Sequence, residues 1–274
     1  MALGILTNVA ATYAENNLNQ TQGSLQSVLQ QLSSGSRINS GADDAAGLSV
    51  ADGLHANEAA LTQSAQNATN GVGLLQTADG ALSQVTNLLD RAVTLATEAS
   101  NGGLTTAQAT AADTEFQSIL TEIGNIGTST NFNSNAVFSA TATDFVVSDG
   151  TTSGTTTISA TTGALSTTSL GFTAADVLTS QTAAKTTLTG ITAAIATVAS
   201  QRGTIGANIN QLNAAANVAS SEEVNLSSAE SNVRSTNYGQ ATSDLAKYQV
   251  LSQTGISALA QANSVQQEIL KLLQ

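Results

Sequence analysis

The chain contains no proline in 274 residues, and its apolar side chains recur at helical spacing over long stretches. Proline interrupts helices because it lacks an amide hydrogen and its ring clashes with the preceding turn. Its absence therefore favours long, uninterrupted helices. The apolar residues are mostly alanine, valine, leucine and isoleucine, and aromatic residues make up only 3% of the chain. This composition suits thin layers of helices, so we expect a mainly α fold.

Three amphipathic stripes predict the central helices. They cover residues 61–99, 109–126 and 188–219. The first lies in one predicted helix over residues 44–100, which Asn101-Gly102-Gly103 would end, as glycines often do. The third contains Ile195, Arg202 and Ile205. Together the stripes predict an elongated antiparallel helical bundle.

Weaker seven-residue repeats occupy both ends of the chain. The N-terminal repeat consists of Leu18, Leu25 and Leu32, and the C-terminal repeat of Leu251, Gly255, Ala258, Ala262, Val265, Ile269 and Leu272. Such spacing is typical of a coiled-coil seam. Helices with so few large apolar residues are marginal without tertiary packing. We therefore expect the two ends to pair with each other or with the ends of further copies.

A polar segment separates the second stripe from the third. Of the 51 residues from Ser139 to Thr189, 24 are serine or threonine. Phe145-Val146-Val147 and Thr155–Ile158 flank the turn signal Asp149-Gly150, which predicts a β-hairpin. We expect a small β-rich insertion in a helical protein.

The charge distribution narrows the possible partners. The net charge is −12, and residues 1–184 hold 14 acidic residues against only Arg37 and Arg91. This balance argues against binding to nucleic acid or to an anionic membrane surface. No apolar run is long enough to predict a membrane span. The first residues lack lysine and arginine and do not resemble a secretory signal peptide, so export would need another route.

Few residues suggest catalysis or metal binding. His55 has no metal-binding motif around it, so we expect a surface or packing role, and the chain has no cysteine. Asp43-Asp44 could bind a cation, but acidic residues also favour a helix N-terminus, which is the better interpretation. Arg202 either extends to the edge of the bundle or pairs across it. We expect no enzyme activity, cofactor, metal or catalytic residue.

Several motifs resemble those of bacterial flagellins and occur in the order of that family. They are Ser33–Ser40, Asp43–Leu48, Gln66–Leu82, Thr130–Asn133, Ser200–Ala207 and Gln253–Leu273. The chain departs from the family at Asn208–Gln211, where an Asn-Arg pair is usual, and at Ser235–Tyr238, where the family has an acidic run. The segment between the two matching parts is short and falls where the family is hypervariable, so the resemblance implies that deletion of most of residues 145–180 is tolerated.

The resemblance implies a division into domains. Residues 1–42 and 235–274 would form an inner coiled-coil domain, residues 43–140 and 187–234 a helical core domain, and residues 141–186 a variable outer segment. It also implies residues for polymerisation and core packing. These are Leu25, Leu32, Arg37, Asn39, Asp43, Asp44, Ile195, Arg202, Ile205, Leu251, Val265, Ile269 and Leu272.

The resemblance further implies a structural subunit of the extracellular flagellar filament, exported without a cleavable signal peptide. Its partners would be further copies of itself, the flagellar export apparatus and an export chaperone, and the filament cap and hook-junction proteins. Arg91, Leu95 and Glu115 match a surface that an animal innate immune receptor reads in some flagellins. The alternative is a hook–filament junction protein, which resembles flagellin at its ends.

Overall fold

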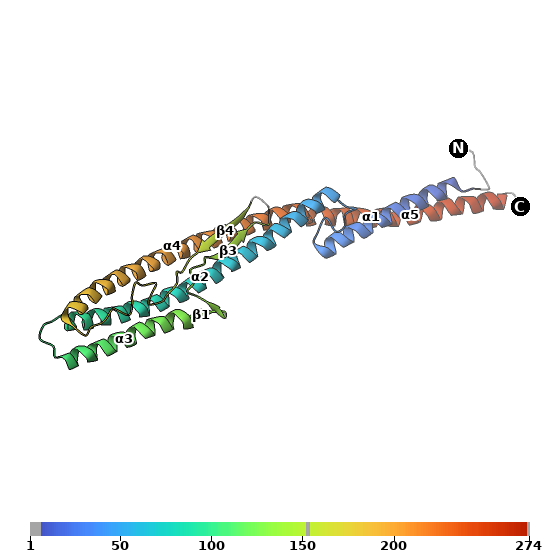
Figure 1. The fold of residues 1–274 in the computed structure, drawn as a ribbon. Helices are drawn as coiled ribbons and strands as arrows, with labels where there is room; N and C mark the ends of the chain where they lie inside the picture. Colours follow the sequence, from blue (N-terminus) through green and yellow to red (C-terminus); the bar gives the residue numbers. More distant parts are fainter. Residues whose placement is uncertain (1–6, 152–153, 273–274) are drawn as a thin grey trace. The chain divides into compact units, whose positions relative to one another are not determined.

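The computed structural model describes residues 7–151 and 154–272, with Thr155 and residues 269–272 described by their backbone alone (Figure 1). The helices of these ranges are α1 (Val9–Ser34), α2 (Ala45–Ala99), α3 (Thr106–Ser129), α4 (Gln181–Arg234) and α5 (Tyr238–Leu272). The strands are β1 (Asn131–Phe132), β2 (Asn135–Ala136), β3 (Thr143–Ser148) and β4 (Thr155–Ala160). The prediction of a mainly α fold with a small β-rich insertion is confirmed. No helix of the described ranges is long and apolar enough to cross a membrane.

The chain divides into two compact units. One contains residues 1–55 and 226–274, and we call it the terminal unit. The other contains residues 56–225, and we call it the central unit. One boundary falls within α2 and the other within α4, and neither coincides with the end of a helix.

Seven-residue spacing explains how α2 and α4 pack in the central unit. The fully or almost fully buried residues of α2 include Leu61, Ala68, Leu75, Leu82, Leu89 and Ala96, and those of α4 include Ile191, Val198, Ile205, Leu212 and Ala219. This period keeps one face of each helix against its neighbour. Helix α3 adds Phe116 and Ile123 to the same core, and Figure 1 shows the three helices side by side. The three predicted stripes are therefore confirmed.

The predicted end of the first long helix is also confirmed. Helix α2 ends at Ala99, just before Asn101-Gly102-Gly103. The next helix begins with a capping box: the Thr105 side chain accepts from the Gln108 backbone N–H, and the Gln108 side chain accepts from the Thr105 N–H at 2.9 Å. Such reciprocal bonds satisfy amides that a helix N-terminus leaves free.

The predicted hairpin forms between β3 and β4. The strands are antiparallel, with Phe145 opposite Ile158 and Ser148 opposite Thr155. Gly150 adopts a positive φ of 84° in the connection. Because L-residues with side chains rarely adopt that conformation, glycine at this position lets the chain turn.

Apolar side chains of the polar segment are part of the central core, which argues against the prediction that most of the segment can be deleted. Its apolar side chains Leu165, Leu170, Phe172 and Leu178 are each at most 4% exposed. The Asp113 carboxylate accepts from the Leu178 backbone N–H at 2.7 Å, which ties the segment to α3. Gly127 of α3 faces the Leu165 carbonyl so closely that a Cβ atom would clash with it. Threonine and serine dominate the composition, but the few large residues between them are buried.

Replacing Ile205 tests the packing of α4. Ile205 is 0% exposed, so Ile205→Asp places a carboxylate in an apolar core and should destabilise the protein by several kcal/mol, roughly 3–5. Val218→Asp on the same helix is the matched control, because Val218 is 56% exposed. Urea unfolding followed by circular dichroism measures both. Equal stability of the two variants would contradict the bundle packing.

Replacing Phe172 tests whether the polar segment is structural. The Phe172 ring contacts the Phe116 ring edge-on, with centroids 6.1 Å apart. Phe172→Ala should cost about 3–5 kcal/mol, the usual range for a buried phenylalanine. Thr168→Ala, at an exposed position of the same segment, should change stability by less than about 0.5 kcal/mol. Thermal unfolding compares them, and an unchanged midpoint for Phe172→Ala would show that the segment does not stabilise the core.

Candidate functional site

Two turns of the terminal unit are joined by backbone pairing. Helix α1 ends at Ser34, and Gly35, with a φ of 72°, provides the left-handed C-cap. Ser36, the next residue, forms an antiparallel bridge with Ser235. The Thr236 N–H donates to the Gly35 carbonyl at 3.0 Å, and the Arg37 N–H donates to the Arg234 carbonyl at 2.7 Å. The α1–α2 and α4–α5 connections thereby hold each other in place.

The Arg37 side chain strengthens this junction. Its guanidinium donates to the Val233 carbonyl at 2.8 Å, in the last turn of α4. Carbonyls at a helix C-terminus lack partners within the helix and attract cations. Asn39, also predicted, donates through Nδ2 to the Ser36 carbonyl at 2.8 Å. Both side chains therefore stabilise the turn that follows α1.

Asp43 and Asp44 organise the start of α2. One Asp43 carboxylate oxygen accepts from the Asn39 N–H, the Ser40 N–H and the Ser40 hydroxyl at 2.8–3.1 Å. These bonds lower the pKa of the Asp43 carboxyl below its ordinary value, and the bond from the Asn39 backbone N–H has the largest effect. Asp44 accepts from the Gly47 N–H at 2.8 Å and so caps the helix. The preferred interpretation, acidic residues at a helix N-terminus, is confirmed.

Helices α1 and α5 run antiparallel in the terminal unit and lie side by side in Figure 1. The Asn8 side chain donates to the Ala262 carbonyl at 3.0 Å, and Leu18 lies against Gly255, where a Cβ atom would be 3.3 Å from Leu18 Cδ1. Leu25 and Leu32 are half-buried, and Val28 is the one buried residue of α1. The expectation that the two ends pair with each other is confirmed.

The predicted C-terminal repeat is wrong at three positions, because these side chains do not face α1 within the chain. Leu251 and Val265 are 43% and 40% exposed, and Ala258 is exposed as well. Leu251 and Val265 each lie one position away from the buried or half-buried face of α5, which rotates them out of the pair. That face combines a few large residues with small or polar ones, and it includes Ala241, Leu245, Tyr248, Ser252, Gly255, Leu259 and Ala262. The side chains of Ile269 and Leu272 lie outside the described residues.

A surface groove of about 530 Å³ follows the α1–α5 pair. Leu18, Tyr248, Leu251, Gly255 and Ala258 contribute to its walls, with polar residues of α1 opposite. Further large apolar side chains of the two helices are exposed: Val9, Tyr13, Leu29, Val250, Ile256 and Val265. The terminal unit therefore combines a narrow internal seam with several large apolar side chains exposed along α1 and α5.

In the central unit, Arg202 pairs across the bundle, as one of the two interpretations predicted. Its guanidinium donates to both carboxylate oxygens of Asp79 on α2, at 2.7 and 3.3 Å. The hydrogen bond to Asp79 raises the pKa of Arg202. Because both side chains are more than a third exposed, the pair contributes orientation rather than much stability. From the same stripe, Ile205 is buried in the core, and the half-buried Ile195 packs against that core.

The predicted receptor surface is only partly exposed. Arg91 donates to both carboxylate oxygens of Glu115 at 2.7 and 3.0 Å, which joins α2 to α3. This hydrogen bonding raises the pKa of Arg91 and lowers that of Glu115. Leu95, however, is 3% exposed. The prediction of Leu95 as a surface residue is therefore wrong, because its position in the seven-residue pattern turns it into the core.

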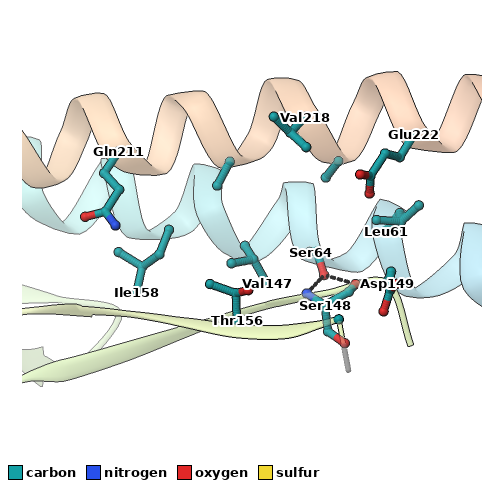
Figure 2. Close-up of a pocket in the computed structure, with 13 residues that line it drawn as sticks. Leu61, Ser64, Val147, Ser148, Asp149, Thr156, Ile158, Gln211, Val218 and Glu222 are labelled. Carbon is teal, nitrogen blue, oxygen red and sulfur yellow. Dashed lines mark hydrogen bonds between the residues drawn. The ribbon is translucent and has the colours of Figure 1, made fainter. Parts of the chain in front are cut away.

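The β-hairpin lies over α2 and α4 and leaves a cavity of about 350 Å³ between them (Figure 2). Leu61, Val147 and Ile158 give it apolar walls, and the carboxylates of Asp149 and Glu222 lie at one end. The Ser64 hydroxyl of α2, buried here, donates to the Ser148 carbonyl at 2.7 Å and accepts from the Ser148 N–H at 2.8 Å.

Sequence reasoning missed Ser64, which fixes β3 to the helix. A signal was present, because Ser64 is a polar residue on the stripe face of α2, four residues before Ala68 and three after Leu61. His55, by contrast, is exposed, with Nδ1 3.5 Å from a Glu230 carboxylate oxygen. This fits the expected surface role.

The turn that Asp43 forms with Asn39 and Ser40 should lose stability in acid. Because the pKa of Asp43 is lowered on folding, its stabilisation is present at neutral pH and is lost as the pH falls through that lowered pKa. The hydrogen-exchange protection of the Asn39 and Ser40 amides, measured by NMR, should fall in this acid range. Asp43→Asn should abolish the transition, whereas Asp52→Asn, at an exposed position of α2, should preserve it. Persistence of the transition in Asp43→Asn would contradict the assignment.

The chain was compared with known proteins. A family model of the bacterial flagellin N-terminal helical region matches residues 5–143, and one of the C-terminal helical region matches residues 188–273. Flagellin of Halalkalibacterium halodurans is 31% identical over 266 residues, covering 97% of this chain and 98% of that protein. Flagellin 1 of Proteus mirabilis is 40% identical over 151 residues, 55% of this chain and 41% of its own length, so the chain spans less than half of that relative.

Among solved structures, the crystal structure of Bacillus cereus flagellin is similar at 31% sequence identity and a TM-score of 0.48. The similarity covers 56% of this chain and 88% of that chain. The family models together match well over half of the chain, on both sides of the polar segment, and the full-length relative agrees with them. The chain therefore belongs to the bacterial flagellins, the structural proteins that form the flagellar filament.

Proposed function

We propose that this flagellin polymerises through the surface of the α1–α5 pair. The observation that carries the proposal is the set of large apolar side chains left exposed there, including Leu251 and Val265. Exposed apolar surface of this extent is typical of a face that another protein covers. Copies that cover it by contacts between different faces would extend a filament rather than close a ring.

The seam within the pair supports the same proposal. Gly255 and Ala262 let α5 approach α1 closely but bury little apolar area, and the larger Leu259 is only half-buried. Burial stabilises by roughly 25 cal/mol per Å² of apolar surface, so small residues contribute little. A helix pair of this kind gains order when neighbours complete its packing. The predicted polymerisation residues Leu25 and Leu32 would serve the internal seam, and the exposed apolar residues of α5 the contact between copies.

Charge substitutions at the exposed apolar positions test the proposal. Leu251→Asp and Val265→Asp should leave the stability of the monomer within about 0.5 kcal/mol of the unaltered chain, because both positions are exposed. They should abolish seeded polymerisation, observed by electron microscopy. Each introduces a charge into a surface that would lose its water on assembly.

Two controls distinguish lost apolar surface from added charge. Gln253→Asp adds a charge at an exposed polar position of α5 and should still polymerise. Leu251→Met keeps an apolar side chain of similar size and should also polymerise. Normal filaments from Leu251→Asp and Val265→Asp would show that other surfaces carry assembly.

The remaining partners follow from family membership. We infer export of this chain through the flagellar export apparatus with a chaperone, without a cleavable signal peptide, and contacts with the filament cap and hook-junction proteins. The relatives compared above are flagellins, which favours a filament subunit over a hook–filament junction protein. The exposed Arg91–Glu115 pair is the part of the predicted receptor surface that an innate immune receptor could contact, and a reporter assay with Glu115→Gln tests it.

A further inference from the structure

The dipeptide Asn-Gly occurs twice in the chain, at Asn70-Gly71 and at Asn101-Gly102. In this dipeptide the backbone nitrogen of glycine can attack the side-chain amide carbon of asparagine. Glycine makes the attack easier because it has no side chain in the way and adopts many backbone conformations. The two copies lie in opposite surroundings, and this contrast separates a reactive dipeptide from a protected one.

Asn70-Gly71 is held in the interior of α2. Gly71 is buried, and a Cβ atom there would be 3.0 Å from both the Leu212 and the Phe145 side chains. In an α-helix the backbone N–H points along the axis to the carbonyl four residues earlier. The Gly71 nitrogen is therefore occupied and directed away from the Asn70 side chain, which itself accepts from Gln66 Nε2 at 3.4 Å.

Asn101-Gly102 lies in the connection between α2 and α3, and both residues are exposed. Of the hydrogen bonds found between described residues, none uses the Gly102 N–H, whereas the Asn101 N–H donates to the Glu98 carbonyl at 3.1 Å. Asn101 Oδ1 would be 4.0 Å from a Cβ atom placed on Gly103. The Asn101 side-chain oxygen thus lies near Gly103, and no helical hydrogen bond holds the Gly102 nitrogen as it does the Gly71 nitrogen.

We propose that Asn101 is a site of spontaneous deamidation. The Gly102 backbone nitrogen gives its proton to solvent and forms a bond to Asn101 Cγ, while the side-chain nitrogen leaves as ammonia. The five-membered succinimide that results is opened by water at either carbonyl, giving aspartate or isoaspartate at position 101. The balance is one water consumed and one ammonia released, with no change of oxidation state.

The surroundings accommodate the negative charge that the reaction creates. Gly102 lies against the side chain of Gln181, the first residue of α4, whose Nε2 would be 3.4 Å from a Cβ atom on Gly102. A carboxylate near a helix N-terminus interacts favourably with the helix dipole. The aspartate product therefore fits this turn, whereas isoaspartate lengthens the backbone by one carbon at position 101.

Peptide mapping of the purified monomer, incubated in mildly alkaline buffer, tests the proposal. Mass spectrometry follows the replacement of the amide group by a hydroxyl at each asparagine. Asn101 should convert at least about tenfold faster than Asn70, because reaction at Asn70 first requires local opening of the helix. In concentrated urea the two rates should become similar. Equal conversion of both in the folded chain, or conversion of Asn101 in urea only, would overturn the proposal.

Two alanine variants identify the nucleophile. Neither Gly102 nor Gly103 has a positive φ, so alanine fits at both positions, and circular dichroism verifies the fold. Gly102→Ala should slow conversion of Asn101 several-fold, whereas Gly103→Ala should leave the rate close to that of the unaltered chain. An unchanged rate in Gly102→Ala, or equal slowing by both variants, would exclude the Gly102 nitrogen as the attacking group.

Discussion

Burial of one continuous apolar stripe on α2 and α4 is the interaction on which the central unit depends. Its seven-residue period aligns Leu75, Leu82 and Leu89 with the facing residues of α4, and α3 and the polar segment complete the same core. Because apolar burial stabilises this core, the polar contacts around it mainly fix how its helices and the hairpin are oriented. Ser64 fixes the hairpin, and the Arg202–Asp79 and Arg91–Glu115 pairs connect α2 to its neighbours. Their exposed charges add little stability of their own.

The terminal unit depends on hydrogen bonds more than on apolar burial. Its seam is narrow, and its fixed points are polar: the bridge at Ser36, the guanidinium of Arg37, and the caps at Asp43 and Asp44. Directional hydrogen bonds at the turns can set the register of α1 against α5 even where burial is small, because each bond has one geometry. The apolar side chains that the seam does not use lie outward. A unit built this way is specified in register and incomplete in burial, which suits a subunit that assembles.

The spacing of apolar residues predicted the regular helices, but it did not predict which residues of irregular segments are buried. The long helices, the end of α2 at Ala99 and the hairpin at Gly150 follow from local patterns that tertiary structure does not override. The burial of Leu165 and Phe172 could not be predicted, because these residues lie in irregular chain without a period. Leu251, Val265 and Leu95 show a second limit: a rotation of about 100° per residue decides whether a side chain faces a partner or solvent. Arg202 left two interpretations open because its partner is 123 residues away.

Charge constrains how copies of this chain approach each other. The central unit carries 12 acidic and three basic residues, and two of those bases, Arg91 and Arg202, are already paired within it. The terminal unit carries seven acidic and four basic residues. Like charges repel over about 8 Å at physiological salt. In the proposed assembly, burial of the exposed apolar side chains of α1 and α5 would offset this repulsion between central units.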